Sequence, residues 1–305
     1  LVITGGSVAE DLDLTNGDTS TLNAATSIVN ASANASILHV TASTNTSTAF
    51  TAAGSNVDLI GSVVADSFTI GTAAAGISAA ITAIDGGTGS DTLVVNSKAS
   101  GSLVNVEAVE NITVNVVGLT GTTSTVTIAA SSKGANDASL VTLTGGLAGN
   151  KTTFAGAITD HAVTIDGSTF VGNMGLTFGD DALIQTNLAD PITIKGGSGT
   201  KDTVTVSASN SDTGAFTMSG IETLVFGNDT GASVLQLVNV TDLGTIALTD
   251  DGGTATAVSI TTYTDQMINL GVTGGAGFDN TSVTVAKTAM TGTADVVNFT
   301  AAETD

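Results

Sequence analysis

The apolar residues of this chain recur in short runs of period two, and this pattern constrains the fold more than any other feature. Each run is a few residues long and is bounded by Gly, Asn, Asp or Ser. Apolar positions at helical spacing are nearly absent, so the sequence predicts an all-β protein built from short strands. The expected strands are 36–40, 57–60, 93–95, 112–116, 125–128, 163–165, 203–206, 258–260 and 282–285.

One segment has a composition that also suits a helix. Residues 73–84 read AAAGISAAITAI and are rich in alanine, the best helix former. Gly76 and Thr82 weaken a helix there. A short helix is therefore the alternative to irregular or strand structure in this segment.

The composition of the core favours a thin interior. Hydrophobic residues make up 41 % of the 305 residues, but aromatic residues only 3 %. Packing must come from Val, Ile, Leu, Ala and Thr, which suits stacked short strands better than a thick two-layer fold. We predict a mostly parallel β-solenoid or β-helix-like fold, possibly mixed with short β-sandwich segments. The expectation is one elongated domain over 1–305, a fragment of a longer chain, with weak subdivisions near 80 and 190.

Charge and cysteine content exclude several classes of function. The formal net charge is −22, and all six basic residues are lysines. Nucleic acid and anionic membranes are therefore poor partners. A surface this acidic has two common explanations: it provides solubility alone, or it holds divalent cations. The absence of cysteine excludes disulfides and cysteine–zinc sites. No apolar stretch is long enough for a transmembrane helix, and the chain begins at Leu1 without a recognisable signal peptide, so we expect a fragment or a processed product.

Three glycine–aspartate turns are the candidate metal sites. They read GGTGSD at 86–91, GGSGTKD at 196–202 and GGAGFD at 274–279. Calcium binds six to eight oxygen atoms from carboxylates, backbone carbonyls and water. Glycines allow a turn tight enough to direct several carbonyls to one centre, and the aspartate supplies charge.

The turns predict a set of calcium ligands, with plain strand-connecting loops as the alternative reading. The predicted set is Gly86, Gly87, Gly89, Asp91, Gly196, Gly197, Gly199, Asp202, Gly274, Gly275, Gly277 and Asp279, with Asp85, Asp180 and Asp181 added from their turn context. The same context makes Asp66, Asp250 and Asp251 candidates as well. Glu107 and Glu222 are expected to cap or pair with a neighbouring coil more readily than to bind metal.

The turns and the composition together resemble one group of proteins. The phrases GSDTL followed by VEAVE at 89–110, and GTKDTV followed by IETL at 199–224, resemble the RTX-type S-layer proteins of Gram-negative bacteria. The resemblance implies export by type I secretion and a calcium-filled β-solenoid. It also implies assembly into a two-dimensional lattice on the cell surface, with possible attachment to lipopolysaccharide through segments outside this chain. The turns here are isolated, whereas those of that group are tandem, which leaves the number of ions open.

Catalysis has little support in the sequence. His39 and His161 are the only histidines, and neither lies in a zinc-protease motif; no Gly-x-Ser-x-Gly turn is present. Carboxylate pairs of a glycosidase are possible by residue type, but aromatic residues for sugar binding are scarce. We therefore expect a non-catalytic, extracellular structural protein that self-associates in a calcium-dependent S-layer lattice. The alternative is an RTX-type adhesin or a component of a biofilm or extracellular fibre.

Overall fold

The described part of the chain consists of β-strands and their connections. The computed structural model describes residues 10–13, 26–31, 38–41, 47–52, 57–74, 76–77, 81–98, 106–117, 123–127, 139–155, 164–178, 192–208, 213–228, 232–250, 257–261, 268–274, 282–285 and 297–303. The chain divides into two compact units, Leu1–Ile158 and Thr159–Asp305. None of the described segments forms a helix of the length and apolarity that crossing a bilayer would require.

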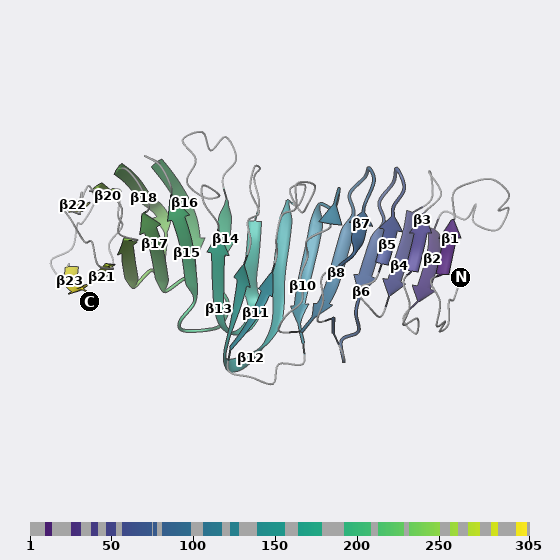
Figure 1. Ribbon diagram of the computed structural model, residues 1–305, viewed down its shortest axis with the longest axis horizontal. Coiled ribbons are helices and arrows are strands. Elements are labelled where there is room, and N and C mark those ends of the chain that lie inside the picture. Colours follow the sequence, from purple (N-terminus) through teal and green to yellow (C-terminus); the bar gives the residue numbers. More distant parts are fainter. Residues whose placement is uncertain are drawn as a thin grey trace. The chain divides into compact units, whose positions relative to one another are not determined.

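Twelve strands of the first unit are described. They are β1 (Glu10–Asp13), β2 (Thr26–Ala31), β3 (Leu38–Thr41), β4 (Ser47–Ala52), β5 (Val57–Ile60), β6 (Ser67–Ile70), β7 (Ala83–Asp85), β8 (Thr92–Ser97), β9 (Val106–Glu107), β10 (Asn111–Val116), β11 (Thr123–Thr127) and β12 (Leu140–Ala155). Figure 1 shows β4, β6, β8 and β10 side by side.

Eleven strands of the second unit are described. They are β13 (Thr164–Phe178), β14 (Thr193–Lys195), β15 (Thr203–Ala208), β16 (Thr213–Ser219), β17 (Thr223–Asn228), β18 (Ala232–Val240), β19 (Thr245–Asp250), β20 (Ala257–Thr261), β21 (Ile268–Gly274), β22 (Ser282–Val285) and β23 (Val297–Glu303).

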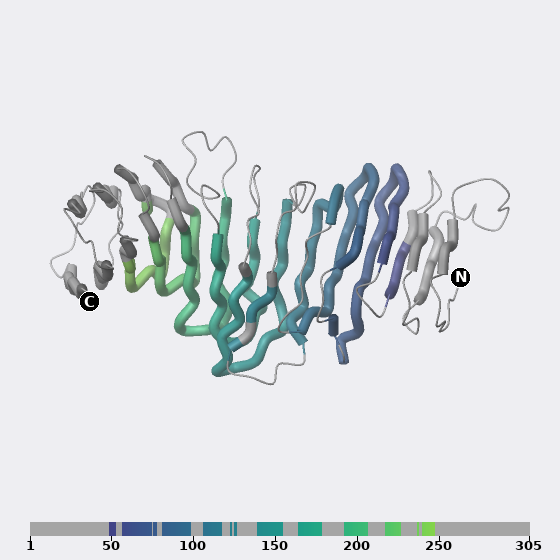
Figure 2. Tube along the Cα trace, viewed as in Figure 1, coloured from purple at the N-terminus to yellow at the C-terminus, as the bar shows by residue number. Residues whose placement is uncertain are grey.

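Alternate strands pair with each other, and every described pairing is parallel. In the first unit β1, β3, β5, β7 and β9 form one sheet, while β2, β4, β6, β8, β10 and β12 form another ladder. In the second unit β13, β15, β17, β19, β21 and β23 form one ladder, and β13, β14, β16, β18, β20 and β22 form another. The chain therefore crosses between two ladders at each short connection, as Figure 2 lets the reader follow from residue 57 to 98.

The core is built from columns of apolar residues in register. In the first unit Phe68 pairs with Phe50 on one side and Leu93 on the other, and all three are buried. The rings of Phe50 and Phe68 stack with centroids 4.8 Å apart. In the second unit Val204 and Leu224 form an equivalent buried pair. Because residues alternate between the two faces of a strand, each period-two run places its apolar residues in such a column.

A polar ladder accompanies the apolar columns in the first unit. Asn96 and Asn115 are register partners on β8 and β10. The Asn115 side-chain amide donates to Asn96 Oδ1 at 2.8 Å, and the Asn96 amide donates to the carbonyl of Gly71 at 3.2 Å. Asn96 is buried, so this bonding satisfies a polar group that would otherwise destabilise the interior.

The expectation of an all-β fold with parallel pairing is confirmed for the described residues. The helical alternative for residues 73–84 is wrong where the chain is described, because Ile77 bridges to Ser97 and Ala83 begins β7. Two strands are much longer than the sequence predicts. β12 contains 16 residues and pairs with β10 at its start and with β11 at its end, whereas β13 contains 15 residues and pairs with β14 at its start and with β15 at its end.

Candidate cation site at the glycine–aspartate corners

Short connections, here called corners, join the strands of one ladder to the next strand of the other. The corners 61–66, 86–91 and 108–110 lead into β6, β8 and β10, and the corners 196–202, 220–222 and 241–244 lead into β15, β17 and β19. Five of these six corners end on an acidic residue. Two of the three predicted calcium turns, 86–91 and 196–202, are corners of this fold.

In the first unit the last corner residues form a column of carboxylates. Asp66, Asp91 and Glu110 each stand immediately before a strand of one ladder. Asp91 Oδ1 accepts a hydrogen bond from the main-chain N–H of Asp66 at 2.6 Å. Glu110 Oε2 accepts one from the main-chain N–H of Asp91, also at 2.6 Å. Asp91 and Glu110 therefore each bind the main-chain amide of the corner acid one strand earlier in the ladder.

The second unit repeats this arrangement. Asp202 Oδ1 accepts the main-chain N–H of Met174 at 2.7 Å, and Glu222 Oε2 accepts that of Asp202 at 2.7 Å. Met174, Asp202 and Glu222 precede register-matched strand segments. Hydrogen bonds from an amide to a charged acceptor are stronger than neutral ones, so these acids stabilise the stacking of successive strands.

The first glycine of a corner is required by close backbone approach. A Cβ on Gly86 would overlap the carbonyl oxygen of Ala108, and one on Gly196 would overlap that of Gly220. The main-chain N–H of Gly86 donates to the carbonyl of Glu107 at 2.9 Å, which holds the neighbouring strands at this distance. Gly89 has φ +140°, where side chains are rarely accommodated.

Two corners are closed by one of their own amides. Asp202 Oδ2 accepts the main-chain N–H of Gly197 at 2.7 Å. Asp66 Oδ2 accepts both the main-chain N–H of Ser62, at 2.5 Å, and its hydroxyl, at 2.8 Å. In each case the second residue of the corner donates to the acid that ends it.

The corner 86–91 is different, because its acid keeps one oxygen without a donor. The N–H of Gly87 donates to Asp85 Oδ1 at 2.9 Å. Asp91 is fully buried, and its Oδ2 has no hydrogen-bond partner among the described residues. This oxygen faces Gly86, since an ideal Cβ there would lie 2.9 Å from it. A buried carboxylate oxygen without a donor is costly for the fold.

Burial and neighbouring acids make the charge on Asp91 unfavourable. Burial raises the pKa of Asp91 from 3.8 to about 6, with smaller contributions from Glu110, Asp66 and Asp85, although the hydrogen bond from Asp66 opposes the shift. Burial also raises the pKa of Asp202, against the hydrogen bonds from Met174 and Gly197. The pKa of Glu222 is raised for the same main reason.

These geometries decide which corner has the donor set for a cation. Asp91 Oδ2 is buried, lacks a donor among the described residues and lies in the field of three other carboxylates, so the corner 86–91 is the stronger candidate for a cation site. Both oxygens of Asp202 already accept amides, so the corner 196–202 in this form does not. Among the described residues, no three acidic or histidine side chains converge as a complete metal-binding cluster. A cation at 86–91 would therefore draw further ligands from backbone carbonyls and water.

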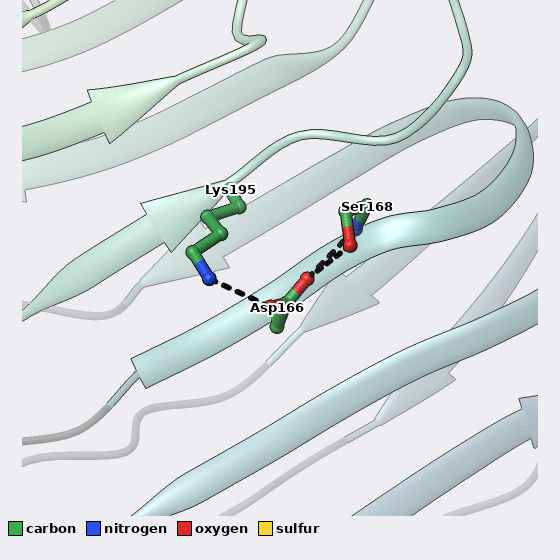
Figure 3. Close-up of polar contacts among 3 residues, drawn as sticks. All are labelled: Asp166, Ser168 and Lys195. Atoms are coloured by element: carbon green, nitrogen blue, oxygen red, sulfur yellow. Dashed lines mark hydrogen bonds and ion pairs between the residues drawn. The ribbon is translucent and has the colours of Figure 1, made fainter.

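A separate polar contact lies on β13 and β14. Figure 3 shows Asp166 between Ser168 and Lys195. The N–H and hydroxyl of Ser168 donate to Asp166 Oδ1 at 3.0 and 2.6 Å, and Lys195 Nζ lies 2.9 Å from Asp166 Oδ2. The hydroxyl of Ser168 and the ammonium of Lys195 lower the pKa of Asp166 to about 2. The carboxylate of Asp166 is thus ionised at neutral pH, and its contact with Lys195 bridges adjacent strands.

The structure brings together part of the predicted ligand set. Gly86, Gly87, Gly89, Asp91 and Asp85 share one corner, and Gly196, Gly197, Gly199 and Asp202 share another. Gly274 ends β21, whereas Gly275, Gly277, Asp279, Asp180 and Asp181 lie outside the described residues. Glu222 binds a neighbouring strand, as the sequence predicts. The sequence features above did not identify Glu110 as a functional residue. The available signal was its position, three residues after Glu107 and directly before a period-two run.

No protein family, no curated protein and no solved structure matches this chain.

Proposed function

We propose that this chain is a structural, non-catalytic protein of the bacterial cell surface that assembles into a calcium-dependent two-dimensional S-layer lattice. The single observation that carries the calcium part of the proposal is the buried Asp91 Oδ2, which has no donor among the described residues and lies among other carboxylates. The lattice part is supported by the composition and motifs that resemble RTX-type S-layer proteins.

The proposed architecture is a β-solenoid in which each coil contributes one strand to each ladder. Strict parallel pairing of alternate strands supports it, because a chain that winds in coils places every second strand beside its predecessor. Asp91, Glu110 and Glu222 support it too, since each binds the main-chain amide of the corner acid one coil earlier. In such a scaffold the acids stabilise the stacking of coils.

The role proposed for calcium is to neutralise the open corner. Asp91 would hold the ion, and Asp85 lies in the same corner to contribute charge. Extracellular calcium modules bind with Kd of roughly 10⁻⁴–10⁻³ M. At about ten times Kd, one site stabilises the fold by about 1.4 kcal/mol. The bound ion would also offset part of the net charge of −22 and so reduce repulsion between neighbouring subunits.

Electron microscopy of the purified chain tests the proposal. Negatively stained samples in millimolar calcium should show ordered sheets, and the same samples in excess chelator should lose them. The Asp91→Asn variant is the matched control, because it removes one carboxylate while keeping the side chain's size and its acceptor for the N–H of Asp66. Isolated rods or monomers in both solutions would contradict the lattice and favour an extended adhesin or a fibre component.

A further inference from the structure

Three corners of this chain carry the same closing acid but a different residue immediately before their first glycine. Asp85 precedes the corner 86–91, Lys195 precedes 196–202 and Ile60 precedes 61–66. The corner preceded by Asp85 has an open carboxylate oxygen. The two preceded by Lys195 and Ile60 are closed by the amide of their second residue.

We propose that the residue before the first glycine determines whether a corner is closed by its own amide or keeps an open carboxylate for a cation. A carboxylate at this position captures the N–H of the second corner residue. The acid at the end of the corner then loses its internal donor. A side chain without an acceptor, such as that of Ile60 or Lys195, leaves that N–H to the closing acid, so the corner satisfies itself.

The hydrogen bonds in the two glycine-rich corners show this competition directly. The N–H of Gly87 lies 2.9 Å from Asp85 Oδ1, two residues back in the chain. The equivalent N–H of Gly197 lies 2.7 Å from Asp202 Oδ2. Lys195 has no acceptor in its side chain, and its ammonium is paired with Asp166. A single main-chain donor thus has two alternative acceptors, and the sequence decides which of them is present.

The length of the corner does not account for the difference. The corners 61–66 and 86–91 have equal length, yet only the first is closed. The corner 196–202 is one residue longer and is also closed. Closure therefore follows the preceding residue, Ile60 or Lys195 as opposed to Asp85.

The consequence for calcium rests on the proposed function. Asp85 is a positioning residue that keeps Asp91 Oδ2 open, and the corner 86–91 is the one that responds to calcium. In the corner 196–202 the N–H of Gly197 binds Asp202 Oδ2, so this carboxylate needs no ion, although the sequence has the same glycine spacing. Two similar motifs in one chain would then differ in their need for metal.

Two variants of Asp85 separate its hydrogen bond from its charge. Asp85→Ala removes the acceptor, so the N–H of Gly87 is expected to turn to Asp91 Oδ2 and close the corner. Asp85→Asn is the control, because its amide oxygen still accepts the N–H of Gly87 while the charge is gone. Calcium titration by calorimetry should show one site fewer in Asp85→Ala and should retain that site, with weaker affinity, in Asp85→Asn.

Thermal unfolding in chelator provides a second readout that needs no metal. Asp85→Ala should melt about 2–4 °C above Asp85→Asn, because only the alanine variant gives the buried oxygen of Asp91 a donor. Equal calcium binding and equal melting temperatures in the two variants would overturn the proposal, since charge alone would then explain the role of Asp85.

The reciprocal variant tests whether the corner 196–202 can gain a calcium site. Lys195→Asp combined with Asp166→Lys preserves an opposite-charge pair between β13 and β14 while placing a carboxylate before Gly196. One additional calcium site is expected, whereas Asp166→Lys combined with Lys195→Ala, as control, should add none, because alanine has no side-chain acceptor for the N–H of Gly197. No gain in the first variant, in a chain that still folds by circular dichroism, would overturn the proposal.

Failure of this inference and failure of the proposed function are distinguishable. If the unaltered chain binds no calcium, the proposed function fails, and the crystal structure of the metal-free Asp85→Ala variant decides the inference alone. A Gly87 N–H within hydrogen-bond distance of Asp91 Oδ2 in that structure supports it. An N–H directed elsewhere overturns it.

Discussion

The main-chain N–H of Asp91 donates to Glu110 Oε2 at 2.6 Å across two adjacent strands of one ladder. The carboxylate of Asp91 in turn accepts the N–H of Asp66, so the residue is a donor to one neighbour and an acceptor for the other. The same chain of bonds links Met174, Asp202 and Glu222. In a protein with 28 acidic residues, part of this charge therefore serves to hold strands together.

Removing the carboxylate of Glu222 is expected to destabilise the second unit. Glu222→Ala leaves the N–H of Asp202 without its acceptor, which should lower the free energy of unfolding by about 1–3 kcal/mol. Glu222→Gln keeps an acceptor oxygen and removes only the negative charge. Because burial raises the pKa of the Glu222 carboxyl, losing this charge should change the free energy of unfolding little. Chemical denaturation monitored by far-UV circular dichroism measures both, and equal losses in the two variants would contradict a hydrogen-bonding role.

A methyl group at the start of a corner is expected to disrupt strand spacing. Gly196→Ala would drive its Cβ into the carbonyl of Gly220, a main-chain atom that cannot move without its strand. A loss of about 1–3 kcal/mol or more is expected from such overpacking. Gly244→Ala is the matched control, since its nearest neighbour, the carbonyl of Glu222, lies at an ordinary 3.7 Å. Thermal melts in which the two variants are equally stable would refute this reading of the corner.

Strand positions were predictable where side chains alternate. The runs at 93–95, 112–116 and 203–206 lie within β8, β10 and β15, because period-two burial is a local property of the sequence. The lengths of β12 and β13 were not predictable in this way. Gly145 and Gly146 have φ +78° and +83° inside β12, so residues that read as strand breakers let the chain bend while pairing continues.

The candidate site was predictable only in part, for a different physical reason. Glycine spacing located Asp91 and Asp202, but not the acceptors and donors that distinguish them. Asp66 closes a corner that reads GSVVAD, which lacks the glycine pattern. Glu110 reaches the N–H of a residue 19 positions earlier, and that contact depends on the register of the entire ladder. Long-range register is not encoded in any single motif.

The fold is expected to become more stable in chelator as pH falls from 7 toward 4. Burial raises the pKa of Asp91 to about 6 in the folded state, against 3.8 as its ordinary value, so the folded chain takes up a proton in this window before the unfolded chain does. This stabilisation is complete below about pH 4 and is lost as pH rises through 6. A shift of this size corresponds to up to about 3 kcal/mol.

Urea denaturation at several pH values measures this effect of Asp91. The free energy of unfolding of the Asp91→Asn variant should change less between pH 4 and 7 than that of the unaltered chain. The remaining pH dependence comes from groups such as Asp202 and Glu222, whose pKa values are also raised. Calcium should reverse the trend, because a bound cation favours the ionised carboxylate. A variant with the same pH profile as the unaltered chain would exclude Asp91 as the source.

Both partners of Asp166 contribute to its ionisation. The hydroxyl of Ser168 is the largest single cause of the low pKa of about 2, and Lys195, whose side chain is 46 % exposed, acts through both a hydrogen bond and its charge. Because the folded pKa is depressed, stability from Asp166 is present above about pH 4 and is lost as pH falls toward 2. Ser168→Ala and Lys195→Met should each raise the pKa of Asp166, as carboxyl carbon NMR titration would show. Lys195→Met should cost only about 0.2–1 kcal/mol, as exposed ion pairs do, and an unchanged pKa of Asp166 in either variant would contradict the assignment.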